Sequence, residues 1–289
     1  MRYSAAIVVA AFASGISAHG VIKSVQGANG VTMPGLSVID GTPRDCATPA
    51  CGSEADTSII RDNELGTSKA SALGRTKGGG AVDPAKNVAA FMGTAAPPTA
   101  ATQKRGLLDS LLGGGGGSNA PTTQGTKTAK GTTENGVAAS AGQGKTAGLP
   151  TTDNTGAITM TFHQVNQDGA GALSADIDPT SGGTDPNAFQ KATVMQDVPG
   201  LGIGGLSAAT TTDFPVKVAM PQGMTCGGTV AGVQNVCIVR MRNQALAGPF
   251  GGSAAFTQSP AAQKRAIEYN LRKRHFARGI LDAPEEESE

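Results

Sequence analysis

A histidine near the start of the chain has the chemistry of a metal ligand if it becomes the N-terminus. Residues 1–18 have the pattern of a secretory signal peptide, with Arg2, a short apolar run and small residues before His19. Cleavage after Ala18 would expose His19 with a free α-amino group beside its imidazole ring. These two nitrogens could chelate one metal ion and leave positions open for other ligands.

A second signal-cleavage site is also consistent with the sequence. Ala11-Phe12-Ala13 also fits the A-x-A cleavage pattern. Cleavage there would leave His19 inside the chain and take away its free amine. The apolar run is too short, and its flanks are wrong, for a membrane-spanning helix. We favour cleavage after Ala18, and we expect a secreted, extracellular protein.

His163 is the second candidate ligand. The chain has three histidines, and the third, His275, lies in a basic C-terminal stretch. The amine and ring of His19 together with the ring of His163 would present three nitrogens in a tetragonal arrangement, which suits copper. The α-amino group has an ordinary pKa of about 7.7–8.0, so a metal ion can displace its proton near neutral pH. The sequence predicts one copper ion as the cofactor.

Other interpretations of these residues stay open. Gln164 could hydrogen-bond near an oxygen-binding position or orient the ligands, and it could equally be an ordinary polar strand end. His163 could be a strand histidine that is hydrogen-bonded to its neighbours. Zinc could occupy the same ligands but would support no redox chemistry.

Composition and charge limit the class of protein. The 289 residues have a net charge of +1, which gives no general attraction to nucleic acid or to anionic membranes. The chain contains 42 Gly, 2 Tyr and no Trp, which favours a β-rich protein with long loops. It also lacks the aromatic stacking platform that many carbohydrate-binding surfaces use.

The four cysteines form an even set in a chain with a secretory signal, so we expect two disulfides. Three pairings are possible. We favour the local one, in which Cys46 pairs with Cys51 and Cys226 pairs with Cys237.

Alternating apolar and polar residues predict the fold. Ile158, Met160 and Phe162 alternate with polar residues, which is the pattern of a half-buried strand that carries His163 on its other face. Further strands are expected at 192–198, 214–220, 235–242 and 254–257, between turns rich in Gly and Pro. Short strands at this spacing predict a mainly β fold, an antiparallel β-sandwich.

The remaining segments indicate the domain organisation that we expect. We expect the sandwich to be a discontinuous domain built from 19–93 and 151–258. Residues 94–150 are of low complexity and have no periodic apolar pattern, which predicts a disordered insertion. Ser259-Pro260 predicts the start of a helix, so 259–289 would form a basic helix followed by an acidic tail.

Dibasic pairs are a further feature of the chain. Lys104-Arg105, Lys264-Arg265 and Lys273-Arg274 are sequences that a secretory-pathway protease could cut.

Three segments resemble a known family. They are His19-Gly20-Val21-Ile22, the stretch 161–171 around His163, and 247–252, which reads Ala-Gly-Pro-Phe-Gly-Gly. Together they resemble secreted fungal virulence factors of the appressorium, the MAS-type, Egh-like proteins, over most of 19–93 and 150–278. The His-Gly start and the central histidine are also similar to lytic polysaccharide monooxygenases, which carry a copper histidine brace on an immunoglobulin-like sandwich.

These resemblances imply roles for single residues. His19 would supply the amine and one ring nitrogen, His163 would supply the third nitrogen, and Phe250 would be the axial aromatic neighbour of copper. The implied fold is an immunoglobulin-like β-sandwich, and the implied activity is that of a copper-dependent oxidoreductase acting on host or fungal cell-wall polysaccharide. The absence of Trp and the scarcity of Tyr depart from many of those enzymes.

Three hypotheses about function follow. The chain is a virulence-associated protein that oxidises cell-wall polysaccharide, a copper-binding protein without catalysis, or a metal-free surface or adhesion protein of the infection structure. In each case we expect a monomer with no nucleic-acid partner and no membrane span.

Overall fold

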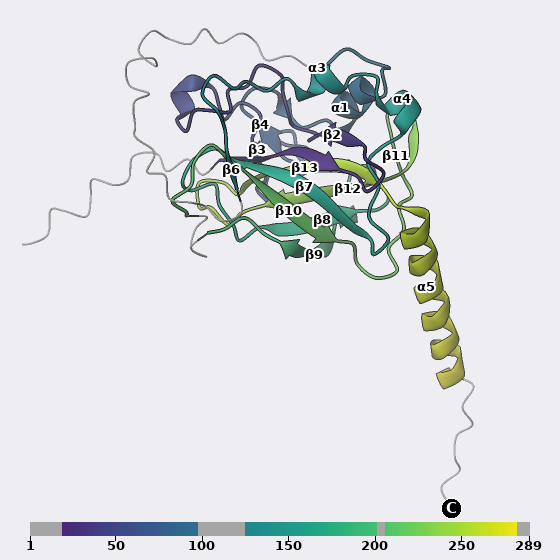
Figure 1. Cartoon of the computed structure of the whole chain (residues 1–289). Helices are drawn as coiled ribbons and strands as arrows, with labels where there is room; N and C mark the ends of the chain where they lie inside the picture. Colours follow the sequence, from purple (N-terminus) through teal and green to yellow (C-terminus); the bar gives the residue numbers. More distant parts are fainter. Residues whose placement is uncertain (1–18, 98–124, 201–205, 282–289) are drawn as a thin grey trace, which may run out of the picture.

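The structure is a computed structural model that describes residues 19–97, 125–200 and 206–281 (Figure 1). The expected signal peptide lies outside the described residues. The strands are β1 (Gly20–Gln26), β2 (Thr32–Pro34), β3 (Ser58–Ile59), β4 (Arg75–Thr76), β5 (Gly80–Ala81), β6 (Thr126–Lys127), β7 (Ala157–Gln164), β8 (Ser174–Asp178), β9 (Gln190–Gln196), β10 (Thr212–Ala219), β11 (Gly228–Val230), β12 (Val233–Arg242) and β13 (Phe250–Thr257).

These strands form one continuous antiparallel sheet. Its order is β2-β1-β7-β10-β9-β8-β12-β13-β3-β4-β5, with β6 beside β10 and β11 beside β12. Each strand expected from alternation is present, although β9, β10, β12 and β13 begin earlier than their apolar residues indicated.

The sheet curls so that its two halves face each other. β1, β7 and β10 form one layer, β8, β12 and β13 form the other, and β9 joins them by pairing with both β10 and β8. Apolar side chains from both layers make the main core, among them Ile22, Phe162, Val216, Ile238 and Phe256. The predicted mainly β, antiparallel sandwich is therefore confirmed.

β1 and β13 approach each other closely across the sandwich. A Cβ atom added at Gly252 of β13 would lie 2.7 Å from the backbone nitrogen of Ile22 in β1. The Leu36 N–H also donates a hydrogen bond to the Ser253 carbonyl at 2.8 Å. This contact brings the start of β1 next to Phe250, the first residue of β13.

Short helices and loops cover the outer face of the first layer. These helices are η1 (Pro49–Cys51), α1 (Pro84–Phe91), α3 (Gly136–Ser140) and α4 (Gly144–Ala147), while η2 (Pro186–Ala188) precedes β9. On this outer face Val21 packs with Val38, Ala90 and Val137.

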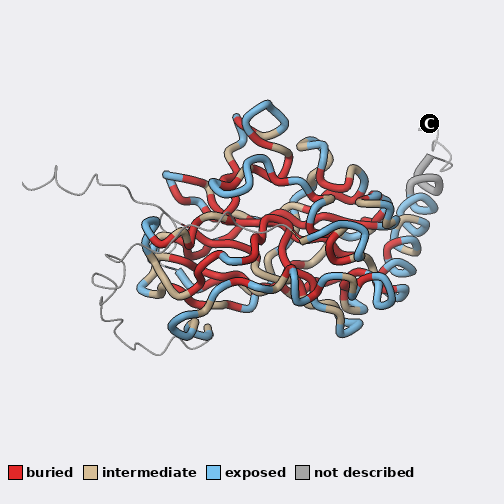
Figure 2. Tube along the Cα trace, turned by 90° about the horizontal axis from the view of Figure 1, so that it is seen from above, coloured by how far each residue is buried: buried red, intermediate tan, exposed pale blue. Residues whose placement is uncertain are grey.

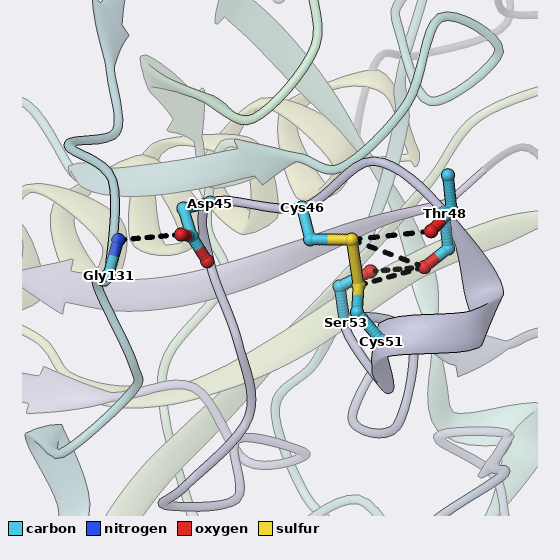
Figure 3. The surroundings of a disulfide bond; sticks show 6 residues. All are labelled: Asp45, Cys46, Thr48, Cys51, Ser53 and Gly131. Atoms are coloured by element: carbon cyan, nitrogen blue, oxygen red, sulfur yellow. Dashed lines mark hydrogen bonds between the residues drawn. A yellow bond between two sulfur atoms is a disulfide. The ribbon is translucent and has the colours of Figure 1, made fainter. Parts of the chain in front are cut away.

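Residues 125–150, which make up most of the described part of the expected disordered insertion, are ordered. Glu134 accepts a hydrogen bond from the fully buried Arg44 at 2.9 Å, and Arg44 also pairs with Asp56. The Asp45 carboxylate accepts from the Gly131 N–H at 2.6 Å (Figure 3). The expectation of disorder is therefore wrong for 125–150, because this segment is ordered by charges and apolar surface that other segments supply.

Both predicted disulfides are present, Cys46–Cys51 and Cys226–Cys237. The first closes the short loop that contains η1, where the Thr48 carbonyl oxygen lies 3.0 Å from Cys51 Sγ (Figure 3). The second joins the approach to β11 to its partner strand β12. The local pairing is thus the correct one of the three.

The predicted C-terminal helix is confirmed as α5 (Pro260–Leu281). Ser259 precedes it, and its hydroxyl oxygen accepts a hydrogen bond from the Ala262 N–H at 3.2 Å. Figures 1 and 2 show α5 leaving the sandwich and projecting away from it. Within the described ranges, no helix combines the length and apolar character that crossing a membrane requires.

Candidate metal-binding site

His163 lies near the end of β7, between β1 and β10. The strand register places it opposite Val21 on one side and opposite Asp213 on the other. Paired residues of antiparallel strands point to the same face, so all three belong to the outer face of the first layer. The His163 side chain is fully buried there, and its Nδ1 lies 2.6 Å from Asp213 Oδ1.

The surroundings of His163 keep its ring neutral. Burial lowers the pKa of His163, and the charges of Arg44 and Lys23 add to this effect, against the opposing influence of Asp213. Burial opposes the ionisation of Asp213, but the His163 contact and the Lys23 ammonium, 2.7 Å away, hold the pKa of Asp213 below its usual value. Neutral His163 therefore donates its Nδ1 hydrogen to an ionised carboxylate.

The other ring nitrogen of His163 is then left with a free lone pair. With the hydrogen on Nδ1, Nε2 is an acceptor. This Nε2 atom is buried and has no hydrogen-bond partner among the residues that the structure describes. A carboxylate on one nitrogen and an available lone pair on the other is the usual arrangement of a metal-ligating histidine.

His19 is attached to the segment that follows β7. Its carbonyl accepts a hydrogen bond from the Val165 N–H at 2.9 Å, and its own N–H donates to Asn166 Oδ1 at 2.8 Å. Gly169 packs so closely against the His19 carbonyl that a side chain there would collide with it. These contacts bury His19, which is only 2% exposed.

The His19 ring lies between an acidic and an aromatic side chain. Its centroid is 4.2 Å from that of Phe250, with the rings tilted by 35°. Its Nδ1 lies 3.0 Å from Glu54 Oε1, yet neither atom has a properly aligned hydrogen bond within the described ranges. Burial opposes ionisation of Glu54, but His19 and the Lys77 ammonium hold the pKa of Glu54 below its usual value.

His19, the residue before β1, occupies a position diagonal to His163 when the strand register is extended by one residue. His163 is opposite Val21, and His19 lies two residues before Val21. Diagonal neighbours of an antiparallel pair are about 7–8 Å apart at Cα and share a face of the sheet. The structure thus brings both histidines and Phe250 to the region where β1, β7 and the start of β13 meet.

The donor set fits a copper ion in part. Nowhere in the described chain do three or more His, Cys, Asp or Glu side chains form a group that could hold a metal. Among the described residues, His163 Nε2 is nevertheless a buried nitrogen without a hydrogen-bond partner, whereas His19 Nδ1 is buried 3.0 Å from Glu54 Oε1. A third nitrogen is available only after cleavage, because the backbone nitrogen of His19 is a peptide N–H in the uncleaved chain.

The other residues singled out in the sequence have different places. Gln164 follows His163 directly and so points to the opposite face of the sheet. Its amide nitrogen lies 2.9 Å from the Asn166 carbonyl and 2.7 Å from the Ala209 carbonyl, which holds the loop that carries Asn166. His275 lies exposed on α5.

Sequence reasoning missed Asp213, Glu54 and Asn166, which contact the two histidines. Asp213 is 50 positions from His163, and nothing in its local sequence marks it. Asn166 lies in the stretch around His163, so of the three residues it alone could have been identified from the sequence near that histidine.

Comparison with known proteins places the chain among fungal virulence factors. The family described as Egh16-like virulence factor matches residues 17–251. The chain is 59% identical over 291 residues to the appressoria-specific virulence factor GAS2 of Pyricularia oryzae, with 99% of this chain and 100% of that protein covered. It is 39% identical over 129 residues to the appressoria-specific virulence factor GAS1 of the same fungus, with 43% and 50% covered. No solved structure matches the chain significantly.

Proposed function

Because this chain belongs to the Egh16-like virulence factor family, as its sequence motifs predicted, we propose that it is a secreted virulence factor of the fungal appressorium that binds one copper ion. The whole-length identity to GAS2 supports the biological setting, since that relative is described as appressoria-specific. Two disulfides support secretion, because such bonds persist mainly in oxidising compartments.

The buried lone pair of His163 carries the metal proposal. An unpaired buried polar atom costs about 1–3 kcal/mol, so a site that retains one needs a reason to do so. His163 Nε2 is such an atom, and Asp213 holds the ring in the tautomer that keeps it available. A ligand that accepts this lone pair would remove the cost.

The proposed ligands are the His19 amine, His19 Nδ1 and His163 Nε2. Phe250 packs on the His19 ring and limits its rotation, and its role as axial neighbour of the metal stays a prediction. Asn166 would keep accepting a hydrogen from the His19 nitrogen. Glu54 would offer a negative charge close to the cation. Copper bound here would supply one-electron redox chemistry.

For the substrate, we propose that cell-wall polysaccharide is oxidised at this site. The competing function is copper binding without catalysis. It is favoured by the burial of both histidines, which are 2% and 0% exposed in the uncleaved chain, because a polymer must reach a metal in order to be oxidised. Production of peroxide together with oxidised oligosaccharides supports catalysis, and copper binding without either product supports the alternative.

Copper titration of the mature protein tests the metal proposal. We expect one Cu(II) per chain of a protein that begins at His19, with a tetragonal three-nitrogen paramagnetic signal. One alanine added before His19 moves the amine while every side chain stays, and it should weaken binding nearly as much as His163→Ala. His275→Ala is the control and should change nothing. Copper binding that is indifferent to the added alanine would eliminate the site built on the His19 amine, and the absence of copper binding would leave the metal-free surface protein as the better hypothesis.

A further inference from the structure

Helix α5 has two halves with different surroundings. In the first half, Ala262 and Ala266 are buried against the sandwich, and Asn270 Nδ2 donates a hydrogen bond to the Gly223 carbonyl at 2.8 Å. Every residue from 271 to 276 is exposed, and Phe276 reaches 73%. Figure 2 shows 271–276 in pale blue, as exposed, at the edge of the buried sandwich.

One dibasic pair lies in each half. Lys264-Arg265 lies in the docked half, between the buried residues Ala262 and Ala266. Lys273-Arg274 lies in the exposed half, where the Arg274 side chain bonds only its own helix, at the Asn270 carbonyl, among the contacts described. We infer that Lys273-Arg274 is a proteolytic processing site for a secretory-pathway endoprotease that recognises paired basic residues.

The proposed reaction is the hydrolysis of one peptide bond. The bond between the Arg274 carbonyl carbon and the His275 nitrogen breaks. Water supplies the oxygen that makes Arg274 a C-terminal carboxylate, and its protons go to the new amine of His275 and to solvent. No oxidant or cofactor takes part.

Local stability explains why this pair is chosen over the other. A protease binds an extended segment, so the helix around the cleaved bond must open first. A helix of fewer than about 12–15 residues is marginal in water without tertiary packing, and the exposed half of α5 is shorter than that. Opening at Lys264-Arg265 must also expose the two buried alanines and break the Asn270 hydrogen bond.

Cleavage would change the charge of the product. Residues 275–289 carry Arg278 and five carboxylates, so the released peptide has a net charge of −4 with His275 neutral. The remaining chain ends in the basic run Arg272-Lys273-Arg274. The product is therefore more basic than its precursor, and this change can be followed by ion exchange as well as by mass.

The test uses the full-length secreted protein from a host that lacks such a protease. The protein is treated with a purified subtilisin-like endoprotease specific for Lys-Arg, and intact mass is followed over time. We expect a product that ends at Arg274, formed about tenfold faster than any product that ends at Arg265, given the buried contacts that hold the docked half. Mass also separates these products from any cut after Arg105, which lies outside the described residues.

Matched variants make the result decisive. K273A/R274A should abolish the product, and K264A/R265A should leave its rate unchanged. Cleavage at Arg265 as fast as at Arg274, or no cleavage at Arg274 during complete digestion of an unstructured Lys-Arg peptide, would overturn the inference. So would material from fungal culture fluid in which the chain still continues past Arg274.

Discussion

Asp213→Asn tests the chemistry of the proposed site most directly. The Asp213 carboxylate accepts a hydrogen from His163 Nδ1 at 2.6 Å and so keeps Nε2 free. An asparagine has nearly the same shape but no charge, and its amide can also present N–H groups to the ring. His163 stays neutral in the variant, because burial, Arg44 and Lys23 lower its pKa and the opposing carboxylate is gone. The substitution therefore changes the tautomer and orientation of the ring rather than its charge.

The expected loss follows from the role of the carboxylate. Removing such a partner of a ligating histidine typically costs 10–100-fold in metal affinity, or about 1.4–2.7 kcal/mol. The assay is competition for Cu(II) between a chelator of known affinity and the mature protein that begins at His19. Lys23→Met is the matched control, because Lys23 pairs with the same carboxylate at 2.7 Å without touching His163. It should change copper affinity much less than D213N.

Equal copper affinity of wild type and D213N would refute the reasoning, provided that both are folded. Unfolding in urea checks that condition. If D213N is folded and binds copper as tightly as wild type, then Asp213 has no influence on the ligand, and the contact with His163 is only structural. If Lys23→Met lowers affinity as strongly as D213N, the effect is one of general charge and not of the His163 tautomer.

Three further predictions concern stability, each measured by urea unfolding. Arg44→Met leaves two carboxylates buried without their cation and should cost about 3–5 kcal/mol. Burial opposes ionisation of Asp178, but its hydrogen bonds hold its pKa below the usual value. Its stabilising contribution is therefore complete above about pH 3.9 and is lost as the pH falls further. Asp178→Asn should reduce the dependence of the unfolding free energy on pH in this acidic range, and an unchanged dependence contradicts the assignment. Gly252→Ala should destabilise by about 1–3 kcal/mol because its Cβ would lie 2.7 Å from Ile22 nitrogen, whereas at Gly227 the nearest atom is 3.8 Å away and Gly227→Ala should cost under about 0.5 kcal/mol.

Local patterns in the chain were enough for several of the strands and for the C-terminal helix, although β7 is buried on both faces and not half-buried as expected. The alternation at Ile158, Met160 and Phe162 predicted both the strand and the outward direction of His163, because side chains of a strand alternate strictly between two faces. The Ser259 cap and the following proline predicted α5 for an equally local reason. The short spacing of the cysteines favoured the pairing that the structure contains.

The same local reasoning failed for residues 125–150. Their composition offers too little apolar surface for a core of their own, which is why it predicted disorder. In the folded chain they add single groups, such as Val137 and Glu134, to an apolar cluster and an ion pair that distant segments complete. Order in such a segment is a property of its surroundings, and composition does not contain it.

The sequence by itself determined a β-rich sandwich with a C-terminal helix and two local disulfides, and it singled out two histidines for the proposed copper site. Only the tertiary structure decided what surrounds those histidines: Asp213 on His163, Glu54 and Phe250 on His19, and the strand register between β1 and β7. It also decided which dibasic pair is held by buried contacts. The physical reason is that register and docking depend on burial summed over many residues far apart in the chain, whereas strand alternation, helix caps and short disulfide loops depend on neighbours within a few positions.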